Sequence, residues 1–68
     1  MVDKLTFGER LRRIRKSKKM SQKELSEKTG LYQIYISNYE NDISLPNCTT
    51  LEWLCKGLGV TATELLGF

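Results

Sequence analysis

The chain has 68 residues, of which 40% are hydrophobic and 28% are charged, and it carries a formal net charge of +3 at pH 7. Its length allows one domain, over residues 1–68, without room for a deep enzyme cleft, and its apolar content is too high for a disordered tail. The sequence has no histidine and no apolar run that would span a membrane or direct secretion, so we expect a cytoplasmic protein without a metal site or a cofactor.

Two capping boxes predict the first two helices. Thr6 and Glu9 have the spacing of such a box and are followed by apolar residues at helical period, which predicts a helix over about 7–18. The same box recurs at Ser21 and opens a second helix. Gly30 should end that helix, because glycine accepts the left-handed conformation found just past a helix C-terminus.

Two further helices are separated by a polar loop. Residues 32–40 form a third short helix with Ile36 on its buried side, and the loop that follows is rich in Asn, Asp, Ser and Pro. Asn47 can cap a fourth helix, which Gly59 can end. The inner stripe of that helix consists of Cys48, Leu51, Leu54, Cys55 and Leu58.

A third capping box, Thr61 with Glu64, opens a last short helix through Leu66. No stretch shows strand-like alternation, so we predict an all-α fold of five short helices. The two cysteines lie two helical turns apart, about 10 Å of rise, which is too far for a disulfide within the chain. We expect both, Cys48 and Cys55, to be small buried hydrophobic residues.

The positive charge is concentrated in the first part of the chain. Residues 1–28 hold ten Lys and Arg residues against four acids, whereas residues 29–68 hold one Lys against four acids. One end of the protein can therefore face an anionic partner.

Residues 22–39 have the layout of a helix-turn-helix. Ser26 supplies a small side chain where the two helices cross, and Gly30 turns the chain between them. Four residues point to the shared core: Leu25, Leu31, Ile36 and Tyr39. Two helices held in this way let the second project into the major groove of DNA, which admits one helix.

Residues 6–66 resemble the Cro and phage-repressor family of helix-turn-helix regulators. The matching segments are LRRIR at 11–15, SQKELS at 21–26, KTGL at 28–31, YISNYEN at 35–41, Pro46, and LGVT at 58–61 leading to ELL at 64–66. The resemblance implies a lambda-repressor-like domain of five helices whose third helix reads bases. It also implies a bacterial or phage transcription regulator, most simply a repressor, that binds a near-palindromic operator as a homodimer.

The resemblance also assigns DNA contacts to particular residues. Gln22, at the start of the second helix, should hold a phosphate together with the exposed backbone N–H groups there, and Lys23 is a further phosphate contact. Gln33 matches the position that reads a base edge, and glutamine can pair bidentately with adenine. The alternative for Gln33 is a solvated polar side chain. Ile34 should contact a thymine methyl group.

Three more polar residues follow on the same helix or directly after it. Ser37 shares the outward face and should contact a base or a phosphate, while Asn38 and Asn41 are placed for contacts to the DNA backbone. Arg15 and Glu40 match a pair that forms a salt bridge between the first helix and the end of the third. The other Lys and Arg residues of the first helix are expected to form a solvated face that contributes long-range attraction.

The sequence departs from the family pattern at two positions. Tyr32 replaces the small capping residue usual before the third helix, so that cap is weaker or the tyrosine itself reaches a phosphate or a base. Asp42 stands where glycine is common and adds a negative charge next to the DNA-facing loop. No Lys or Arg lies between Gly30 and Pro46, so non-specific affinity should be modest and binding should depend on dimerisation.

A partner surface is suggested by Trp53, which lies off the inner stripe of the fourth helix, and by Phe68, which ends the chain beside Leu65 and Leu66. The alternative is that Trp53 lies over the last helix. A different function is also open: an antitoxin-type module whose main partner is another protein. An enzyme is disfavoured, because no paired carboxylates or glycine-rich phosphate loop accompany the lack of histidine. We expect no small-molecule ligand.

Overall fold

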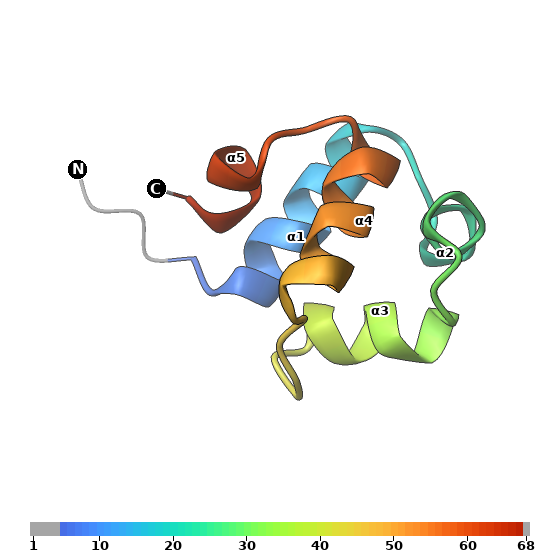
Figure 1. Ribbon diagram of the computed structural model, residues 1–68, viewed down its shortest axis with the longest axis horizontal. Coiled ribbons are helices and arrows are strands. Elements are labelled where there is room, and N and C mark those ends of the chain that lie inside the picture. Colours follow the sequence, from blue (N-terminus) through green and yellow to red (C-terminus); the bar gives the residue numbers. More distant parts are fainter. Residues whose placement is uncertain (1–4, 68) are drawn as a thin grey trace.

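The computed structural model describes residues 5–67 and contains five helices in that range. They are α1 (Phe7–Ser17), α2 (Gln22–Thr29), α3 (Gln33–Glu40), α4 (Cys48–Leu58) and α5 (Ala62–Leu66). α3 packs against α1 and α2, α4 packs against α2, and α5 packs against α1 and α4; in Figure 1, α2 lies to the right, α3 along the bottom and α5 to the left. The all-α fold of five helices predicted from the sequence is confirmed.

The helices begin where the capping residues predicted. The side chains of Thr6, Ser21 and Thr61 each accept a hydrogen bond from the backbone N–H of the glutamate three residues later, which completes three capping boxes. Asn47 caps α4 by accepting from the N–H of Thr50. Gly30 ends α2 in the left-handed conformation, with φ of 78°. Local hydrogen bonding therefore sets most of the helix boundaries.

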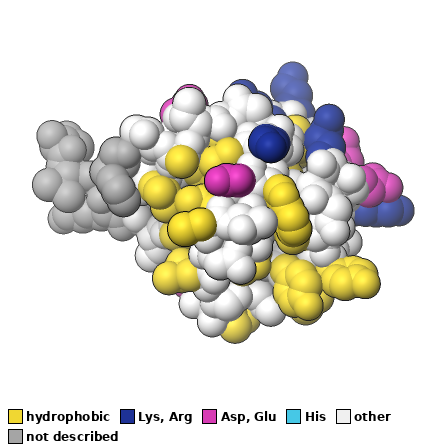
Figure 2. All heavy atoms as spheres, viewed as in Figure 1, with side chains coloured by type: hydrophobic (Ala, Val, Ile, Leu, Met, Phe, Trp, Pro, Cys, Tyr) yellow, Lys and Arg dark blue, Asp and Glu magenta, His cyan; other side chains and the backbone are white. Residues whose placement is uncertain are grey.

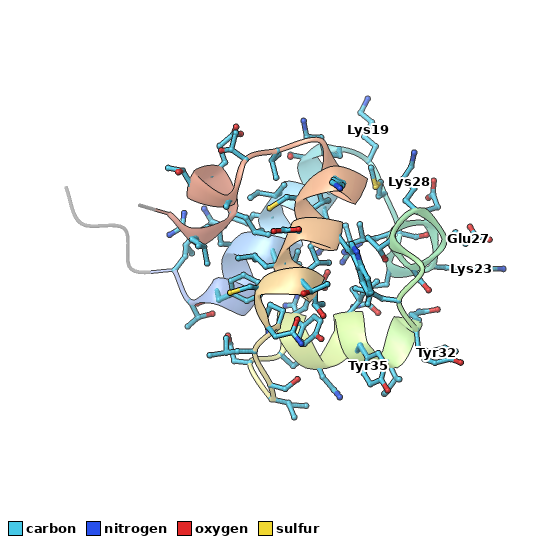
Figure 3. The ribbon with its side chains drawn as sticks, in the orientation of Figure 1. Lys19, Lys23, Glu27, Lys28, Tyr32 and Tyr35 are labelled. Atoms are coloured by element: carbon cyan, nitrogen blue, oxygen red, sulfur yellow. The ribbon has the colours of Figure 1, made fainter. Side chains whose placement is uncertain are left out.

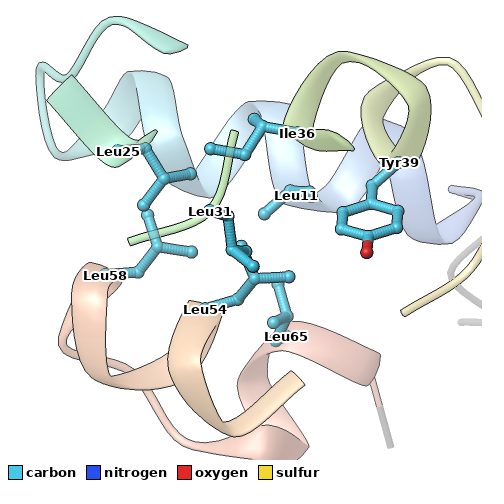
Figure 4. Close-up of a cluster of buried hydrophobic side chains, with 8 residues drawn as sticks. All are labelled: Leu11, Leu25, Leu31, Ile36, Tyr39, Leu54, Leu58 and Leu65. Atoms are coloured by element: carbon cyan, nitrogen blue, oxygen red, sulfur yellow. The ribbon is translucent and has the colours of Figure 1, made fainter. Parts of the chain in front are cut away.

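One core joins all five helices. It consists of Leu11, Leu25, Leu31, Ile36, Tyr39, Leu54, Leu58 and Leu65, which converge in Figure 4. Full burial of a leucine contributes about 1.5–3 kcal/mol, so these contacts hold α3 in place with its opposite face turned outward. No helix within residues 5–67 is long and apolar enough to cross a membrane.

The predicted burial of Cys48 and the predicted position of Leu65 on a partner surface are both wrong. Cys48 is exposed, because it is the first residue of α4 and begins the helix outside the core, next to the exposed Asn47 and Thr49. Cys55 is half-buried, and burial together with nearby Glu52 and Glu64 raises the pKa of its thiol. Leu65 was expected on a partner surface but is fully buried in the core, so it cannot offer a side chain to another molecule.

Candidate DNA-binding surface

The turn between α2 and α3 is held by side-chain hydrogen bonds. The hydroxyl of Ser26 donates to the carbonyl of Leu31, and the hydroxyl of Thr29 accepts from the Leu31 N–H at 3.2 Å. These bonds fix the direction in which α3 leaves the turn. Ile36, Tyr39 and Glu40 are buried on the inner side of α3, whereas Gln33, Ile34 and Tyr35 are exposed.

Three of the predicted contact residues line one shallow hollow on this outer face. Gln33, Ile34 and Ser37 lie there together with Gln22 from the start of α2. Lys23 follows Gln22 in α2, and its side chain extends from the same side of the molecule as Tyr32 (Figure 3). Gln22, a predicted phosphate contact, is thus brought beside three predicted contact residues of α3.

Two tyrosines extend this surface. Tyr32 is the N-cap residue of α3 and makes no side-chain capping bond, so the weaker cap expected from the sequence is present. The exposed rings of Tyr32 and Tyr35 lie 5.8 Å apart at an interplanar angle of 58°. Tyr35 was not predicted as a site residue. Its signal in the sequence is the three-residue spacing from Tyr32, which places both rings on one side of a helix.

Glu40, at the end of α3, is the centre of a buried polar network. Its Oε2 accepts from Arg15 Nε at 2.5 Å and its Oε1 from Arg15 Nη2 at 3.1 Å, so the predicted pair between α1 and α3 is present. The same Oε1 accepts from Gln22 Nε2 at 3.0 Å and lies 3.5 Å from Arg12 Nε. One carboxylate therefore ties together α1, α2 and α3.

The environment of Glu40 keeps its side chain charged. Burial by itself would raise the pKa of Glu40. Hydrogen bonds from Arg15, Gln22 and Arg12, together with the positive charge of Arg15, outweigh that effect and lower the pKa below its ordinary value. Arg15 also donates from Nη1 to the carbonyl of Met20 at 2.7 Å. The network is satisfied on every side, as a buried ion pair requires.

The predicted DNA-backbone-contacting asparagines lie at the C-terminal end of α3, and the side chain of Asn41 is held by the protein itself. Asn41 Nδ2 donates to the carbonyl of Ser37 at 2.9 Å, and Asn41 Oδ1 accepts from Arg12 Nη2 at 3.1 Å. Asn38 is half-buried, and its backbone carbonyl accepts from the Ile43 N–H at 2.9 Å. Both residues therefore lie at the C-terminal end of α3, where they fix the start of the following loop.

Asp42 has a structural role that the sequence did not reveal. It adopts a left-handed backbone with φ of 58°. Its carboxylate accepts from the Thr6 hydroxyl at 2.6 Å and from the Gly8 N–H at 3.0 Å. The charge that was expected to be unhelpful beside the DNA-facing loop is used as an additional cap at the positive end of α1. A Cβ on Gly8 would lie 2.5 Å from the Glu40 carbonyl oxygen, so this junction also requires glycine.

Several lysines and the exposed apolar residues of the loop after α3 lie on different parts of the surface. Lys19, Lys23 and Lys28 extend from the α1–α2 turn and from α2 (Figure 3), and Figure 2 shows Lys and Arg side chains gathered on that side. On the other side, Ile43 and Leu45 in the loop after α3 are 70% and 72% exposed. Leu45 lines an apolar hollow together with Phe7, Pro46, Leu51 and Leu66.

The partner surface suggested by the sequence does not form one patch. Trp53 is 45% exposed, but it follows Leu51 by two residues, about 200° around the helix. Trp53 shares its side of α4 with Gly57, which packs closely against Thr29 of α2. Leu66 lies in the apolar hollow on the Leu51 side, Leu65 is buried, and Phe68 lies outside the described residues. The two exposed apolar features therefore face different directions.

Residues 8–67 of the chain match the model of a protein family described as "Helix-turn-helix domain". The chain belongs to this helix-turn-helix family. Control protein C.BamHI from Bacillus amyloliquefaciens is 38% identical over 66 residues, which are 96% of this chain and 82% of that protein. The immunity repressor of Bacillus phage phi105 is 35% identical over 93% of this chain, but the match spans only 44% of the repressor's length.

Solved structures of the helix-turn-helix family share the fold. The restriction-modification controller protein C.AhdI from Aeromonas hydrophila superposes with a TM-score of 0.85 at 30% identity, covering 88% of this chain and 91% of that one. The P22 c2 repressor, crystallised with a synthetic operator, has a TM-score of 0.84 at 34% identity, covering 91% and 94%. The resemblance to Cro and phage-repressor regulators found in the sequence is confirmed.

Proposed function

We propose that this protein is a sequence-specific DNA-binding transcription regulator that inserts α3 into the major groove. The observation that carries the proposal is the outer face of α3, where Gln33, Ile34 and Ser37 lie beside Gln22 at the start of α2. One polar and one apolar side chain next to a helix N-terminus match the donors, acceptors and methyl groups of a major groove flanked by phosphates. Its helix-turn-helix relatives named as repressors and controllers support the same role.

The residues of this surface divide into those that read bases and those that position the helix. Gln33 pairs with a base edge, and Ile34 packs against a thymine methyl group. Gln22 has one amide N–H engaged by Glu40, and its second amide N–H, with the first backbone N–H groups of α2, faces a phosphate. Lys23 adds a phosphate contact. The remaining contacts come from Tyr32, Ser37, Asn38 and Asn41.

The regulator acts as a homodimer. Two copies that place α3 in successive turns of the major groove have half-site centres about 34–36 Å apart. The described part of the protein measures 34 × 23 × 21 Å, a size comparable with that spacing. The end of α1 and the turn to α2 carry Lys16, Lys18 and Lys19 without an acid among them, and these charges would repel a second copy on that side. The apolar hollow around Leu45 and Leu66 lies at the other end of α3 and supports contact there, with the two-fold axis beside the 41–47 loop.

The chain works as a single DNA-binding domain over residues 1–68, without catalytic activity and in the cytoplasm, where operator DNA is reached. The curated phage relative is longer than this chain, so this proposal concerns the domain alone.

Selection of bound sequences from random duplex DNA tests the proposal most directly. The expected result is an enriched near-palindrome with half-sites one helical turn apart, bound by two copies as counted by analytical ultracentrifugation. An asymmetric enriched site bound by one copy would overturn the dimer. The absence of any enriched sequence, together with recovery of a second polypeptide on purification from the native host, would favour an antitoxin-type module instead.

A further inference from the structure

Among the described residues, two arginines share one carboxylate at the end of α3. Arg15 and Arg12 both lie beside Glu40, but Glu40 carries one negative charge. The Glu40 side chain is fully buried, the Arg15 side chain is 9% exposed, and the Arg12 side chain is 42% exposed. Because the closer and more buried Arg15 pairs with the carboxylate, the excess positive charge of the cluster reaches solvent at Arg12.

Among residues 5–67, the two other acids near this end of α1 accept hydrogen bonds from neutral groups. Asp42 accepts from Thr6 and Gly8, and Glu9 accepts from the Thr6 backbone N–H in the capping box. Neither forms an ion pair with Arg12 among the described residues. The acid within ion-pair distance of Arg12 in this part of the chain is Glu40, which Arg12 shares with Arg15.

Arg12 is also held in a defined position beside the reading surface. Its Nη2 donates to Asn41 Oδ1 at 3.1 Å, and Asn41 in turn donates to the Ser37 carbonyl. Its Nε lies 3.5 Å from the same Glu40 oxygen that accepts from Gln22 Nε2. Ser37 and Gln22 both line the hollow over α3. The guanidinium is thus anchored at the edge of that hollow, with its Nη1 N–H groups without a partner among residues 5–67.

We propose that Arg12 binds a phosphate of the DNA backbone and is the main cation that anchors the C-terminal end of α3 to DNA. This inference rests on the proposed function and revises the expectation that the cations of α1 form only a solvated face. No Lys or Arg lies between Gly30 and Pro46, so α3 and its loop bring no cation of their own. Arg12 supplies that charge from α1, prearranged by Glu40 and Asn41, and a planar guanidinium suits phosphate oxygens.

The test compares Arg12→Gln with Arg13→Gln, which removes the next arginine of α1, an exposed residue about 100° further around the helix. DNA affinity is measured over a range of salt concentrations on the selected operator and on random duplex. Arg12→Gln should reduce the slope of log affinity against log salt by about 0.9 for each half-site. If the variant and the wild type bind equally at 1 M salt, this smaller slope gives the variant a roughly tenfold lower DNA affinity per half-site at 0.1 M salt.

The loss should be similar on operator and random DNA, and the preferred sequence should not change, because phosphates carry no base identity. Arg13→Gln should change the slope less. Arg12→Lys, which keeps the charge, should retain the wild-type slope, and urea unfolding of each variant shows whether it is folded. If the wild-type protein binds DNA and the salt slopes of Arg12→Gln and Arg13→Gln are equal, the proposed role of Arg12 is overturned. A wild-type protein that binds no duplex would overturn the proposed function itself.

Discussion

The carboxylate of Asp42, in the loop after α3, accepts a hydrogen bond from the hydroxyl of Thr6, which lies 36 residues earlier at the start of α1. The contact caps α1 and at the same time fixes the loop that leaves the recognition helix. Asp42 holds a left-handed backbone to make it, a conformation that costs a non-glycine residue about 1–2 kcal/mol. The hydrogen bonds to Thr6 and Gly8 must offset that cost.

Replacing Asp42 with alanine should lower the free energy of unfolding. The variant keeps the strained backbone and loses a cap, and loss of a cap typically costs about 0.5–2 kcal/mol. Asp42→Gly should be less destabilising than Asp42→Ala, because glycine relieves the strain although it also loses the cap. Urea unfolding measures both, with Glu27→Ala on the exposed surface of α2 as the control. Equal stability of Asp42→Ala and the wild type would show that the cap contributes nothing.

Arg15→Ala should destabilise the fold and leave the preferred DNA sequence unchanged. The substitution leaves the Glu40 carboxylate buried without its main partner, which costs about 3–5 kcal/mol when burial is deep. Because a small domain has only about 5–15 kcal/mol in total, the variant should be studied at low temperature. Unfolding curves and operator selection are the two measurements. Normal stability with a changed base preference would place Arg15 on the DNA instead.

The same pair predicts how stability depends on pH. The pKa of Glu40 in the folded protein is lower than its ordinary value of 4.5, so its contribution to stability is complete above that value. The contribution is lost as the pH falls through the folded pKa, because the unfolded chain takes up the proton first. The free energy of unfolding should therefore decrease with acid below about pH 4.5. Glu40→Gln should be less stable at neutral pH and should show a smaller acid dependence; an unchanged dependence would contradict the assignment.

Much of this architecture follows from residues close together in sequence. The three capping boxes, the turn at Gly30 and the apolar spacing of Leu25, Leu31 and Ile36 act over a few residues, and all were predicted. The features that were missed depend on tertiary contacts. Asp42 reaches Thr6 across 36 positions, and Gly8 is required because the carbonyl of Glu40 lies against it. Neither distance is encoded in a local pattern.

The surface was harder to predict for the same reason. Leu65 and Leu66 are neighbours in sequence, yet one is in the core and the other in the apolar hollow. Trp53 was grouped with them because it lies off the inner stripe of α4 near an apolar terminus, but it shares its side of α4 with Gly57, which packs against α2. The position of Arg12 depends on its tertiary contacts with Glu40 and Asn41, which lie far along the chain and leave no local pattern in the sequence.

The separation of these surfaces predicts which substitution weakens self-association. Leu45→Glu should weaken the homodimer with little loss of monomer stability, because the side chain is 72% exposed and its new charge would have to be buried against the partner. Trp53→Ala should leave self-association closer to wild type. Sedimentation over a range of protein concentrations, with melting temperatures for both variants, separates the two faces. A larger loss of dimer from Trp53→Ala would move the interface to the α2 side of α4.

Base reading should depend on Gln33. If its amide pairs with one base edge, Gln33→Ala should lose roughly 1–3 kcal/mol of binding free energy on the best site, concentrated at one base pair in each half-site. Specificity should relax at that base pair and elsewhere remain as in the wild type. The measurement is competition binding against a panel of operators that differ from the best site by single base pairs.

Gln22 provides the contrast within the same hollow. Its amide is expected to hold a phosphate, so Gln22→Ala should weaken operator and random DNA by similar factors and keep the ranking of the panel. Part of its effect should appear as lost stability, because Gln22 also donates to Glu40 at 3.0 Å. Neither glutamine is charged, so both variants should keep the wild-type salt slope, whereas Lys23→Ala should flatten it by about one unit. If Gln33→Ala kept the ranking of the panel while Gln22→Ala changed it, the assignment of base reading to the outer face of α3 would be wrong.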